Sequence, residues 1–298
     1  MKPKDYAKLF RLKHYIKNVL IFMPFAVDYS LLGKNNLITA LCGFCAFCFI
    51  SSCAYILNDL CDFENDRNHP VKQNRPIASG KISVGGSIAL LSVFAALAAA
   101  AGLLSDYVSG TRGVFVIIGF LVLNIIYSSF AKFVPVLEMM FIPAGFIMRL
   151  VYGYIILGRR PDIMPAVFIF LSAFYFVLHK RSAEKSLCGS ATRKVLGHYS
   201  LKALNILSLI TMIASVALFG LLQFYFDLFP TNIVQKIISV AVLCALFVRF
   251  EMLSAGTKTE NTVEIVLSDR LMCIFSIAFA ASLIDYPSLV HFISAGGV

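Results

Sequence analysis

The chain has 298 residues, of which 59% are hydrophobic and only 14% are charged, and its mean hydropathy is +0.83. This composition excludes an ordinary soluble domain and predicts an all-α polytopic membrane protein with a single domain over residues 1–298. The net charge of +10 suits anionic lipids and ligands of a bilayer protein, so no nucleic acid partner is expected.

Apolar runs predict nine transmembrane helices, because a bilayer crossing takes about 20 apolar residues. The first predicted span is interrupted by Pro24 and Asp28, and a signal peptide is its alternative interpretation, although no small-residue cleavage site follows. The predicted spans cover residues 17–33, 36–57, 84–104, 112–130, 134–157, 163–180, 202–226, 232–253 and 269–293.

The positive charges predict the orientation of these spans. Most of the 26 Lys and Arg residues fall in the N-terminal leader and in the loops on the same side of the predicted membrane. Cytoplasmic loops carry such an excess of positive charge. We therefore expect an integral protein of the plasma (inner) membrane with a cytoplasmic N-terminus and, from the odd number of spans, an external C-terminus.

A group of acidic and amide side chains follows the second predicted span directly. Asp59, Asp62 and Asp66 are three and four residues apart, so on a helix their carboxylates share one face and repel one another unless a cation is present. Oxygen ligands of this kind are those that Mg²⁺ prefers. The predicted Mg²⁺ ligands are Asn58, Asp59, Asp62 and Asp66, and a solvated helix end is the alternative.

Basic residues follow the acids in a loop where Pro70, Pro76 and Gly80 impose turns. Carboxylates for a metal beside cations for phosphate oxygens suit a departing diphosphate, since negative charge builds on its oxygens as the bond breaks. The alternative interpretation of these cations is the positive-inside bias, which places Lys and Arg in cytoplasmic loops whatever the function. The predicted catalytic set is Asp59, Asp62, Asp66, Lys72, Arg75 and Lys132.

Later segments on the same side contribute further polar residues. Tyr127 and Lys132 end the fourth predicted span, Glu138 follows in the fifth, and Arg149 lies about three turns deeper on that helix. A guanidinium at that depth must face protein or a wet cavity. A structural ion pair is the alternative, but eleven residues along one helix make Glu138 a poor sole partner.

The sixth predicted span closes with two adjacent cations, Lys180 and Arg181, and a carboxylate, Glu184. His179 precedes them, and we interpret it as a structural or interfacial histidine. Four of the eight cysteines, Cys42, Cys45, Cys48 and Cys53, lie in one apolar span at helical spacing. We expect these thiols to pack between helices, because no zinc-binding or disulfide pattern is present.

The acidic motif and the Lys72 and Arg75-Pro76 segment after it resemble the first aspartate-rich motif of the UbiA superfamily of intramembrane prenyltransferases. The resemblance implies nine helices around a central cavity that opens to the cytoplasmic side. Most members carry a second aspartate-rich motif after the sixth helix and use both clusters with Mg²⁺ to ionise a prenyl diphosphate. This chain has Lys180-Arg181-x-x-Glu184 at that place.

In having Lys180-Arg181-x-x-Glu184 instead of a second aspartate-rich motif, the chain resembles the branch of decaprenyl-phosphate phosphoribosyltransferases. The segment from His69 to Gly80, the Tyr127–Lys132 stretch and Lys17-Asn18 near the start also resemble this branch, whereas Glu138 stands where the branch commonly has Asp. Together with the residues considered above, the predicted substrate-binding set is Asn58, Lys17, Tyr127, Glu138, Arg149, Lys180, Arg181 and Glu184.

The expected function is transfer of 5-phosphoribose from 5-phosphoribosyl 1-diphosphate to a decaprenyl-like polyprenyl phosphate, for cell-envelope glycolipid precursors. The two substrates together would bring three phosphate groups into one site, which needs more cations than one prenyl diphosphate does. Lys180 and Arg181 would supply these additional cations. Prenyl transfer to an aromatic or other small acceptor is the main alternative. An ion-coupled transporter is a remote one, because the ionisable groups cluster in loops on one side and not at the midplane.

Overall fold

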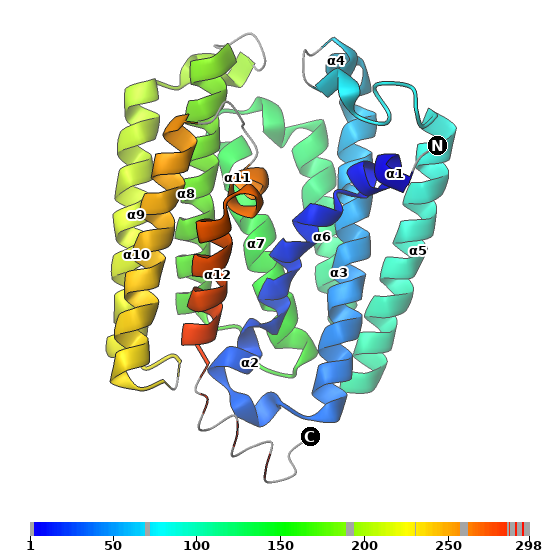
Figure 1. The fold of residues 1–298 in the computed structure, drawn as a ribbon. Coiled ribbons are helices and arrows are strands. Elements are labelled where there is room, and N and C mark those ends of the chain that lie inside the picture. Colours follow the sequence, from blue (N-terminus) through cyan, green and yellow to red (C-terminus); the bar gives the residue numbers. More distant parts are fainter. Residues whose placement is uncertain are drawn as a thin grey trace. The chain divides into compact units, whose positions relative to one another are not determined.

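The computed structural model describes residues 3–68, 72–188, 194–229, 231–256 and 262–284, together with positions 286, 290 and 294. All regular elements in these residues are helical (Figure 1). Seven described helical segments are long and apolar enough to cross a membrane, which confirms the all-α membrane fold. They are Lys34–Cys61, Val84–Ser109, Val114–Phe133, Leu137–Ile156, Ile163–Ser186, Leu201–Phe224 and Ile233–Ser254.

The first predicted span, residues 17–33, differs from the prediction because it is not one continuous helix. The 3-10 helix η1 (Leu12–Phe22) is followed by the short helix α2 (Met23–Val27) and a 3-10 turn, η2 (Tyr29–Leu31). Pro24 has no backbone N–H to continue the bonding of η1. Asp28 then accepts the N–H of Ser30 at 3.0 Å and starts the next turn.

The ninth predicted span, residues 269–293, is also shorter as a described helix. Helix α12 (Arg270–Ser282) has 13 residues, and much of the predicted span after it lies outside the described residues. Asp269 begins this helix, because its side chain accepts the backbone N–H of Met272 at 2.9 Å. The short helix α11 (Thr262–Ser268) precedes it.

The chain forms two compact units, each of which is described by itself. The first comprises Met1–Met23, Lys34–Phe141 and Met148–Pro161, and the second comprises Pro24–Gly33, Ile142–Ile147 and Asp162–Val298.

In the first unit, helix α3 (Lys34–Cys61) is the central element. It packs along α5 (Val84–Ser109) and contacts α6 (Val114–Ser129), η1 and α1 (Pro3–Phe10) (Figure 1). Of the most apolar stretch of α3, 61% is buried, compared with 17% in α5, so α3 is the core helix of this unit. The end of α3 is therefore a well-supported position for functional side chains.

The remaining elements of the first unit are short or shared between the units. Helix α4 (Phe63–Arg67) continues from α3, and the 3-10 turns η3 (Lys72–Asn74) and η4 (Ala131–Phe133) follow α4 and α6. Helix α7 (Leu137–Ile156) contributes its two ends to the first unit and its middle to the second.

In the second unit, α8 (Ile163–Cys188) packs against α9 (Leu201–Phe224), and α10 (Ile233–Gly256) packs against α9 and α12 (Figure 1). The 3-10 turn η5 (Lys194–His198) precedes α9. The side chain of Lys185 near the end of α8 donates to the backbone carbonyls of Leu196, at 2.9 Å, and Tyr199. These bonds tie the end of α8 to the segment before α9.

Helix η1 is unusually long for a 3-10 helix, which rarely exceeds about four residues. Its three-residue turn aligns Tyr15, Asn18 and Ile21 on one side of the helix. The Tyr15 hydroxyl and Ser52 Oγ on α3 are 2.6 Å apart, and Asn18 Nδ2 donates to Cys48 Sγ at 3.2 Å. Contacts at successive turns therefore hold η1 against α3.

Candidate active site

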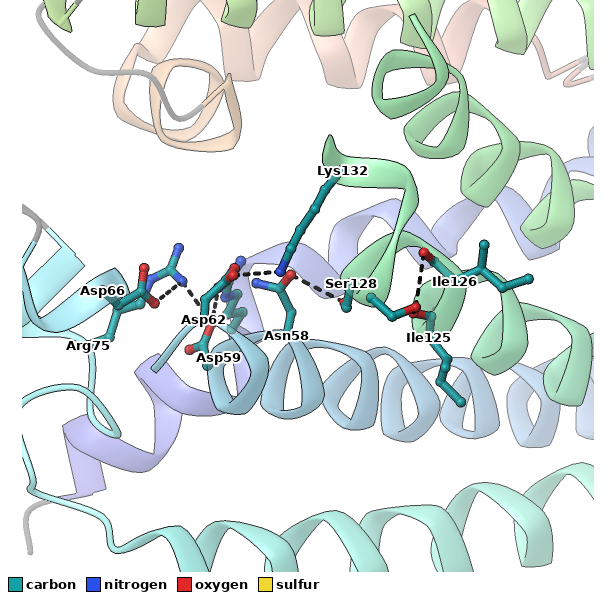
Figure 2. Close-up of polar contacts among 11 residues, drawn as sticks. Asn58, Asp59, Asp62, Asp66, Arg75, Ile125, Ile126, Ser128 and Lys132 are labelled. Carbon is teal, nitrogen blue, oxygen red and sulfur yellow. Dashed lines mark hydrogen bonds and ion pairs between the residues drawn. The ribbon is translucent and has the colours of Figure 1, made fainter. Parts of the chain in front are cut away.

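The acidic residues lie along the end of α3 and the start of α4 (Figure 2). The N–H of Asp62 donates to the Asn58 carbonyl at 2.9 Å, and the N–H of Asp66 donates to the Asp62 carbonyl at 2.8 Å. Helical bonding thus continues across the junction between α3 and α4, and the acids keep their helical spacing. Asp59 and Asp66 are buried, with 3% and 4% exposure, so their charges need partners inside the protein.

Arg75 joins two of these acids through one nitrogen atom. Its Nη1 lies 3.0 Å from Asp59 Oδ1 and 2.6 Å from Asp66 Oδ2 (Figure 2). Burial raises the pKa of the Asp66 carboxyl group, the charge of Arg75 opposes that rise, and the nearby carboxylates of Asp59 and Asp62 add to it. Two carboxylates thus converge on one positive charge.

The loop that carries Arg75 is anchored by apolar packing. Ile77, two residues later, is buried in a cluster with Leu9 of α1, Ile56 of α3 and Ile82. Gly80 closes the loop with a positive φ of 74°, and its N–H donates to the Ile77 carbonyl at 3.0 Å. Arg75 therefore reaches the acids from a segment that is held by its own apolar residues.

Lys72 lies at the start of the same turn. The N–H of Arg75 donates to the Lys72 carbonyl at 2.9 Å, so these two predicted catalytic cations are separated by one 3-10 turn.

The segment after α6 provides the cation for the third acid. Lys132 on η4 places its Nζ 2.6 Å from Asp62 Oδ1, and only 10% of the Lys132 side chain is exposed (Figure 2). The hydroxyl of Ser128 donates to Asn58 Oδ1 at 3.4 Å. The structure therefore brings the predicted residues Asn58, Asp62 and Lys132 together.

Arg11 is a further cation of the site, and no sequence motif singles it out. Its Nη2 lies 2.6 Å from Asp59 Oδ1, and its guanidinium lies 4.7 Å from the ring centroid of Tyr55. The residue joins α1 to η1 with a φ of 51°, in the left-handed region that non-glycine residues rarely adopt. In the sequence, Arg11 is one of several cations before the first predicted span. Its left-handed backbone between α1 and η1 distinguishes it from them, and this conformation is visible in the structure and not in the sequence.

The start of α7 adds a buried carboxylate and a strained turn. Glu138 is fully buried. The predicted residue Tyr127 packs its ring 6.1 Å from that of Phe141 on α7. Just before Glu138, Val136 has a φ of 66° and the N–H of Leu137 donates to the carbonyl two residues earlier at 2.7 Å, which is the rare classic γ-turn.

Arg149 lies deeper on α7 and has 5% exposure. Its Nε donates to Asn18 Oδ1 at 2.7 Å and its Nη2 donates to Ser51 Oγ at 3.2 Å. The guanidinium also lies 4.8 Å from the ring centroid of Phe120. These described partners are neutral, and Lys17, another predicted site residue, directly precedes Asn18 on η1.

A glycine allows η1 to approach α7 at this point. A Cβ atom at Gly153 would lie 2.3 Å from the backbone carbonyl oxygen of Ile21. This approach is one helical turn from the bond between Asn18 and Arg149. Because residue 153 has no side chain, η1 can lie close enough to α7 for Asn18 to bind Arg149.

The predicted residues Lys180, Arg181 and Glu184 lie on α8 in the second unit. Arg181 is fully buried and forms an ion pair with Glu184, three residues further along the helix. A cation and a carboxylate that were both expected to bind substrate are therefore partners of each other. Their participation in one site with the acidic residues of α3 stays a prediction.

His179, also on α8, joins a partly exposed polar network. Its Nε2 lies 2.8 Å from Glu251 Oε2 on α10, and the Tyr175 hydroxyl donates to Glu251 Oε1 at 2.8 Å. Aromatic rings of Phe247 and Phe250 surround Tyr175. These contacts link α8 to α10 and favour the structural interpretation of His179.

The acidic residues fit a hard divalent cation by their donor chemistry. Among the described residues, no group of three or more His, Cys, Asp and Glu side chains is arranged to hold a metal ion. Arg75 Nη1, however, already places a positive charge between Asp59 and Asp66, where oxygen donors from both sides converge. An ion held by these oxygens together with Asn58 and Asp62 would take the place of a side-chain cation.

The fold and the site define a polytopic membrane protein with an acidic helix end paired to Arg and Lys residues from three other segments. Residues 19–260 match the UbiA prenyltransferase family. The chain belongs to this family and is an integral membrane transferase, so the resemblance seen in its first motif is confirmed.

Two relatives and one solved structure illustrate the similarity. The chain is 28% identical over 298 residues to the decaprenyl-phosphate phosphoribosyltransferase of Corynebacterium glutamicum, covering 93% of this chain and 86% of the relative. The chain is also 26% identical over 296 residues to the decaprenyl-phosphate phosphoribosyltransferase of Mycolicibacterium smegmatis, covering 93% of this chain and 90% of that relative. A UbiA homolog from Archaeoglobus fulgidus bound to GPP and Mg²⁺ has the same fold, with a TM-score of 0.67, 20% identity and coverage of 94% and 96%.

Proposed function

We propose that this protein transfers 5-phosphoribose from 5-phosphoribosyl 1-diphosphate to a polyprenyl phosphate, for cell-envelope glycolipid precursors. The observation that carries the proposal is the pairing of Asp59, Asp62 and Asp66 with Arg11, Arg75 and Lys132. A site with both charges within 3.0 Å of each other suits a metal-bound diphosphate, whose oxygens need cations and whose metal needs carboxylates.

The choice of donor is supported by two further observations. The relatives from Corynebacterium glutamicum and Mycolicibacterium smegmatis carry the name of this activity and align with 93% of the chain. After the sixth predicted span, the chain has Lys180 and Arg181 in place of a second aspartate-rich motif. Additional cations suit a substrate pair that brings three phosphate groups into one site.

In the proposed reaction, an oxygen of the lipid phosphate attacks the anomeric carbon of the ribose. The bond from that carbon to the diphosphate breaks, and the diphosphate leaves with the bonding electron pair. Ionised phosphate is already nucleophilic, so little general-base assistance is required. When bound, Mg²⁺ would neutralise charge on the leaving diphosphate; the residues that would hold it are Asn58, Asp59, Asp62 and Asp66.

The other residues of the site are proposed to bind and orient the substrates. Cations around the acids would contact the diphosphate oxygens, and these are Arg11, Lys72, Arg75 and Lys132. Lys180 and Arg181 are proposed to contact the remaining phosphates. Glu138 and Glu184 would orient ribose hydroxyls or join the metal shell, and Tyr127 would line the site.

The membrane placement is part of the same proposal. Positive charges concentrate in the leader and in the loops that carry the acidic cluster, which favours a cytoplasmic N-terminus and a cytoplasmic site in the plasma membrane. A water-soluble phosphosugar would then enter from the cytoplasm, and the lipid acceptor would enter from the bilayer.

Purified protein offered labelled 5-phosphoribosyl 1-diphosphate or labelled prenyl diphosphate, each with polyprenyl phosphate or an aromatic acceptor, tests the proposal. We expect label in the lipid fraction from the phosphosugar with polyprenyl phosphate. Incorporation from prenyl diphosphate alone would assign prenyl transfer instead.

Two matched variants tie that activity to the site. We expect Asp62→Asn to lower transfer by at least about a hundredfold, since it removes a charged ligand. Asp162→Asn is the control, because Asp162 accepts the N–H of Met164 at 3.0 Å and Asn can do the same. Full activity in a folded Asp62→Asn protein would contradict the proposed role.

A further inference from the structure

A cavity of about 320 Å³ lies between α1 and the first turns of α5, within the first unit. Its lining residues on α5 recur three and four positions apart, at Gly86, Ala89, Leu90 and Val93, so they form one stripe along that helix. Tyr6 contributes the wall on α1. Small side chains in the middle of the stripe leave the room that larger ones would fill. The volume is at the lower end of the range of ligand sites, which is about 300–1,000 Å³.

Aromatic contacts hold α1 against α5 beside this cavity. The ring centroids of Tyr6 and Phe10 are 6.0 Å apart, and those of Phe10 and Phe94 on α5 are 4.5 Å apart. Figure 1 shows α1 beside the start of α5. The cavity is therefore a space between two packed elements, and not the surface of a single helix.

One end of the cavity is open to the bilayer. Val93, at this end of the stripe, is 54% exposed, and Ile88 between the turns is 52% exposed. Both belong to a span of 26 residues, and only 17% of its most apolar stretch is buried. The exposed apolar side chains of such a span contact lipid. The helix rises about 14 Å from Val84 to Val93, so the stripe runs from the membrane surface into the acyl region.

The other end of the cavity carries charge. Lys81 directly precedes the lining residue Ile82, and 52% of its side chain is exposed. Its Nζ lies 3.5 Å from Oδ1 of Asp5, which directly precedes Tyr6. This distance is long for an ion pair, where about 2.7–2.9 Å is usual. The exposed Lys8 lies three residues after Asp5, on the same side of α1. Among the described side chains at this end, two cations thus face one carboxylate.

From these features we infer that the cavity binds an anionic phospholipid of the bilayer. One acyl chain lies along the α5 stripe, and the headgroup phosphate lies at Lys81. Apolar burial combined with the attraction of basic residues to anionic headgroups is how proteins recognise such lipids. Tyr6 has an apolar ring and a polar hydroxyl, which suits the boundary between chain and headgroup. The inference does not depend on the proposed transfer reaction.

A structural lipid fits this place better than an acceptor lipid does. Ile82 belongs both to the cavity wall and to the buried apolar cluster that contains Leu9 and Ile77. Leu9 is two residues before Arg11, and Ile77 is two residues after Arg75. A lipid in the cavity would therefore support the packing that holds both arginines at the acids. Its phosphate would lie at the pair of Lys81 and Asp5, away from the acidic end of α3.

Native mass spectrometry of the purified, detergent-solubilised full chain tests the inference. The protein is titrated with phosphatidylglycerol or phosphatidylcholine of the same acyl chains. We expect one retained phosphatidylglycerol, bound about tenfold more tightly than phosphatidylcholine. Ala89→Phe should weaken the retained lipid by at least about tenfold, because the ring fills the cavity. Ala96→Phe is the matched control, since Ala96 is exposed on α5 two turns further along and does not line the cavity.

A second pair of variants tests the headgroup position. Lys81→Gln should lower the preference for phosphatidylglycerol over phosphatidylcholine by about fivefold. Lys13→Gln removes the same charge from an exposed position of η1 and should leave the preference unchanged. The comparison of these two variants decides the matter if Ala89→Phe fails to fold.

The contrary outcomes are specific. A wild-type protein that retains neither lipid or shows no preference for phosphatidylglycerol would overturn the site. Equal retention by Ala89→Phe and Ala96→Phe would overturn its place in the cavity, and equal preferences of Lys81→Gln and Lys13→Gln would overturn the headgroup assignment. A polyprenyl phosphate that displaces phosphatidylglycerol at equal concentration from the wild-type protein, but does not bind Ala89→Phe, would assign the cavity to that lipid instead.

Discussion

Arg75 and Asp66, nine residues apart in the sequence, meet at 2.6 Å through Nη1 and Oδ2. The same nitrogen lies 3.0 Å from Asp59. The acidic end of α3 is thus neutralised by a side chain of the protein itself. In the proposed site, a divalent ion held by these oxygens would replace Arg75 and free its guanidinium for the phosphate oxygens of the substrate.

This shared contact predicts energetic coupling between the two residues. Arg75→Met should lower the free energy of unfolding by about 1–3 kcal/mol, because it leaves buried carboxylates without this partner. The double variant Arg75→Met/Asp66→Asn should lose less than the sum of the single variants. Thermal or denaturant unfolding of the four proteins measures the coupling, and strictly additive losses would contradict it. Arg160→Met, at an exposed position, is the control.

Metal removal should abolish transfer and also weaken donor binding. Treatment with a chelator is expected to reduce phosphosugar affinity, since the diphosphate charge is then balanced by side chains alone. Added Mg²⁺ should restore both binding and transfer in the wild-type protein. In Asp59→Asn the restoration should require a higher metal concentration. Donor affinity that is indifferent to the chelator would show that the acids act without a metal.

Gly153 predicts a stability cost when the approach of η1 to α7 is blocked. Gly153→Ala should destabilise the protein by about 1–3 kcal/mol, since its Cβ would meet the Ile21 carbonyl at 2.3 Å. If the variant folds, its donor binding should also weaken. Gly220→Ala is the matched control, because among the described residues no atom outside its own stretch of helix backbone lies within 4 Å of a Cβ at that position. It should be neutral or stabilising by up to about 1 kcal/mol. Equal stabilities of the two variants would contradict the packing argument.

The γ-turn at Val136 predicts a conflict between stability and activity. Val136→Gly should raise the unfolding midpoint, since a β-branched residue at positive φ costs about 1–3 kcal/mol. Transfer should fall, because the turn sets the path from Lys132 to Glu138. Val134→Gly, with an ordinary φ of −101°, should only destabilise. A Val136→Gly protein that is less stable than wild type would show that the turn is not strained.

Much of the fold could be predicted from the sequence, because long apolar runs determine where α3 and α5 to α10 cross the membrane. The segment from residue 12 to residue 31 could not be predicted, since its 3-10 geometry depends on contacts with Ser52, Cys48 and Gly153 in other elements. Such contacts are tertiary, and no local pattern encodes them.

In the candidate site, too, some residues could be predicted from the sequence and others depend on tertiary contacts. The acids, Arg75 and Lys132 could be found from their spacing and position at the ends of apolar runs. Arg11 could not, because its contact with Asp59 depends on a left-handed backbone at one residue. The neutral partners of Arg149, which are Asn18 and Ser51, were likewise hidden by their distance in sequence.

The 3-10 geometry of η1 determines the distance that this segment spans. An α-helix of the same eleven residues would be shorter by about 5 Å, because it rises about 1.5 Å per residue where a 3-10 helix rises about 2.0 Å. Rewinding would pull Arg11 off Asp59 or Ile21 off Gly153. Insertion or deletion of a single residue within η1 would rotate the residues beyond it by about 120°, so Tyr15, Asn18 and Ile21 would no longer share one side of the helix.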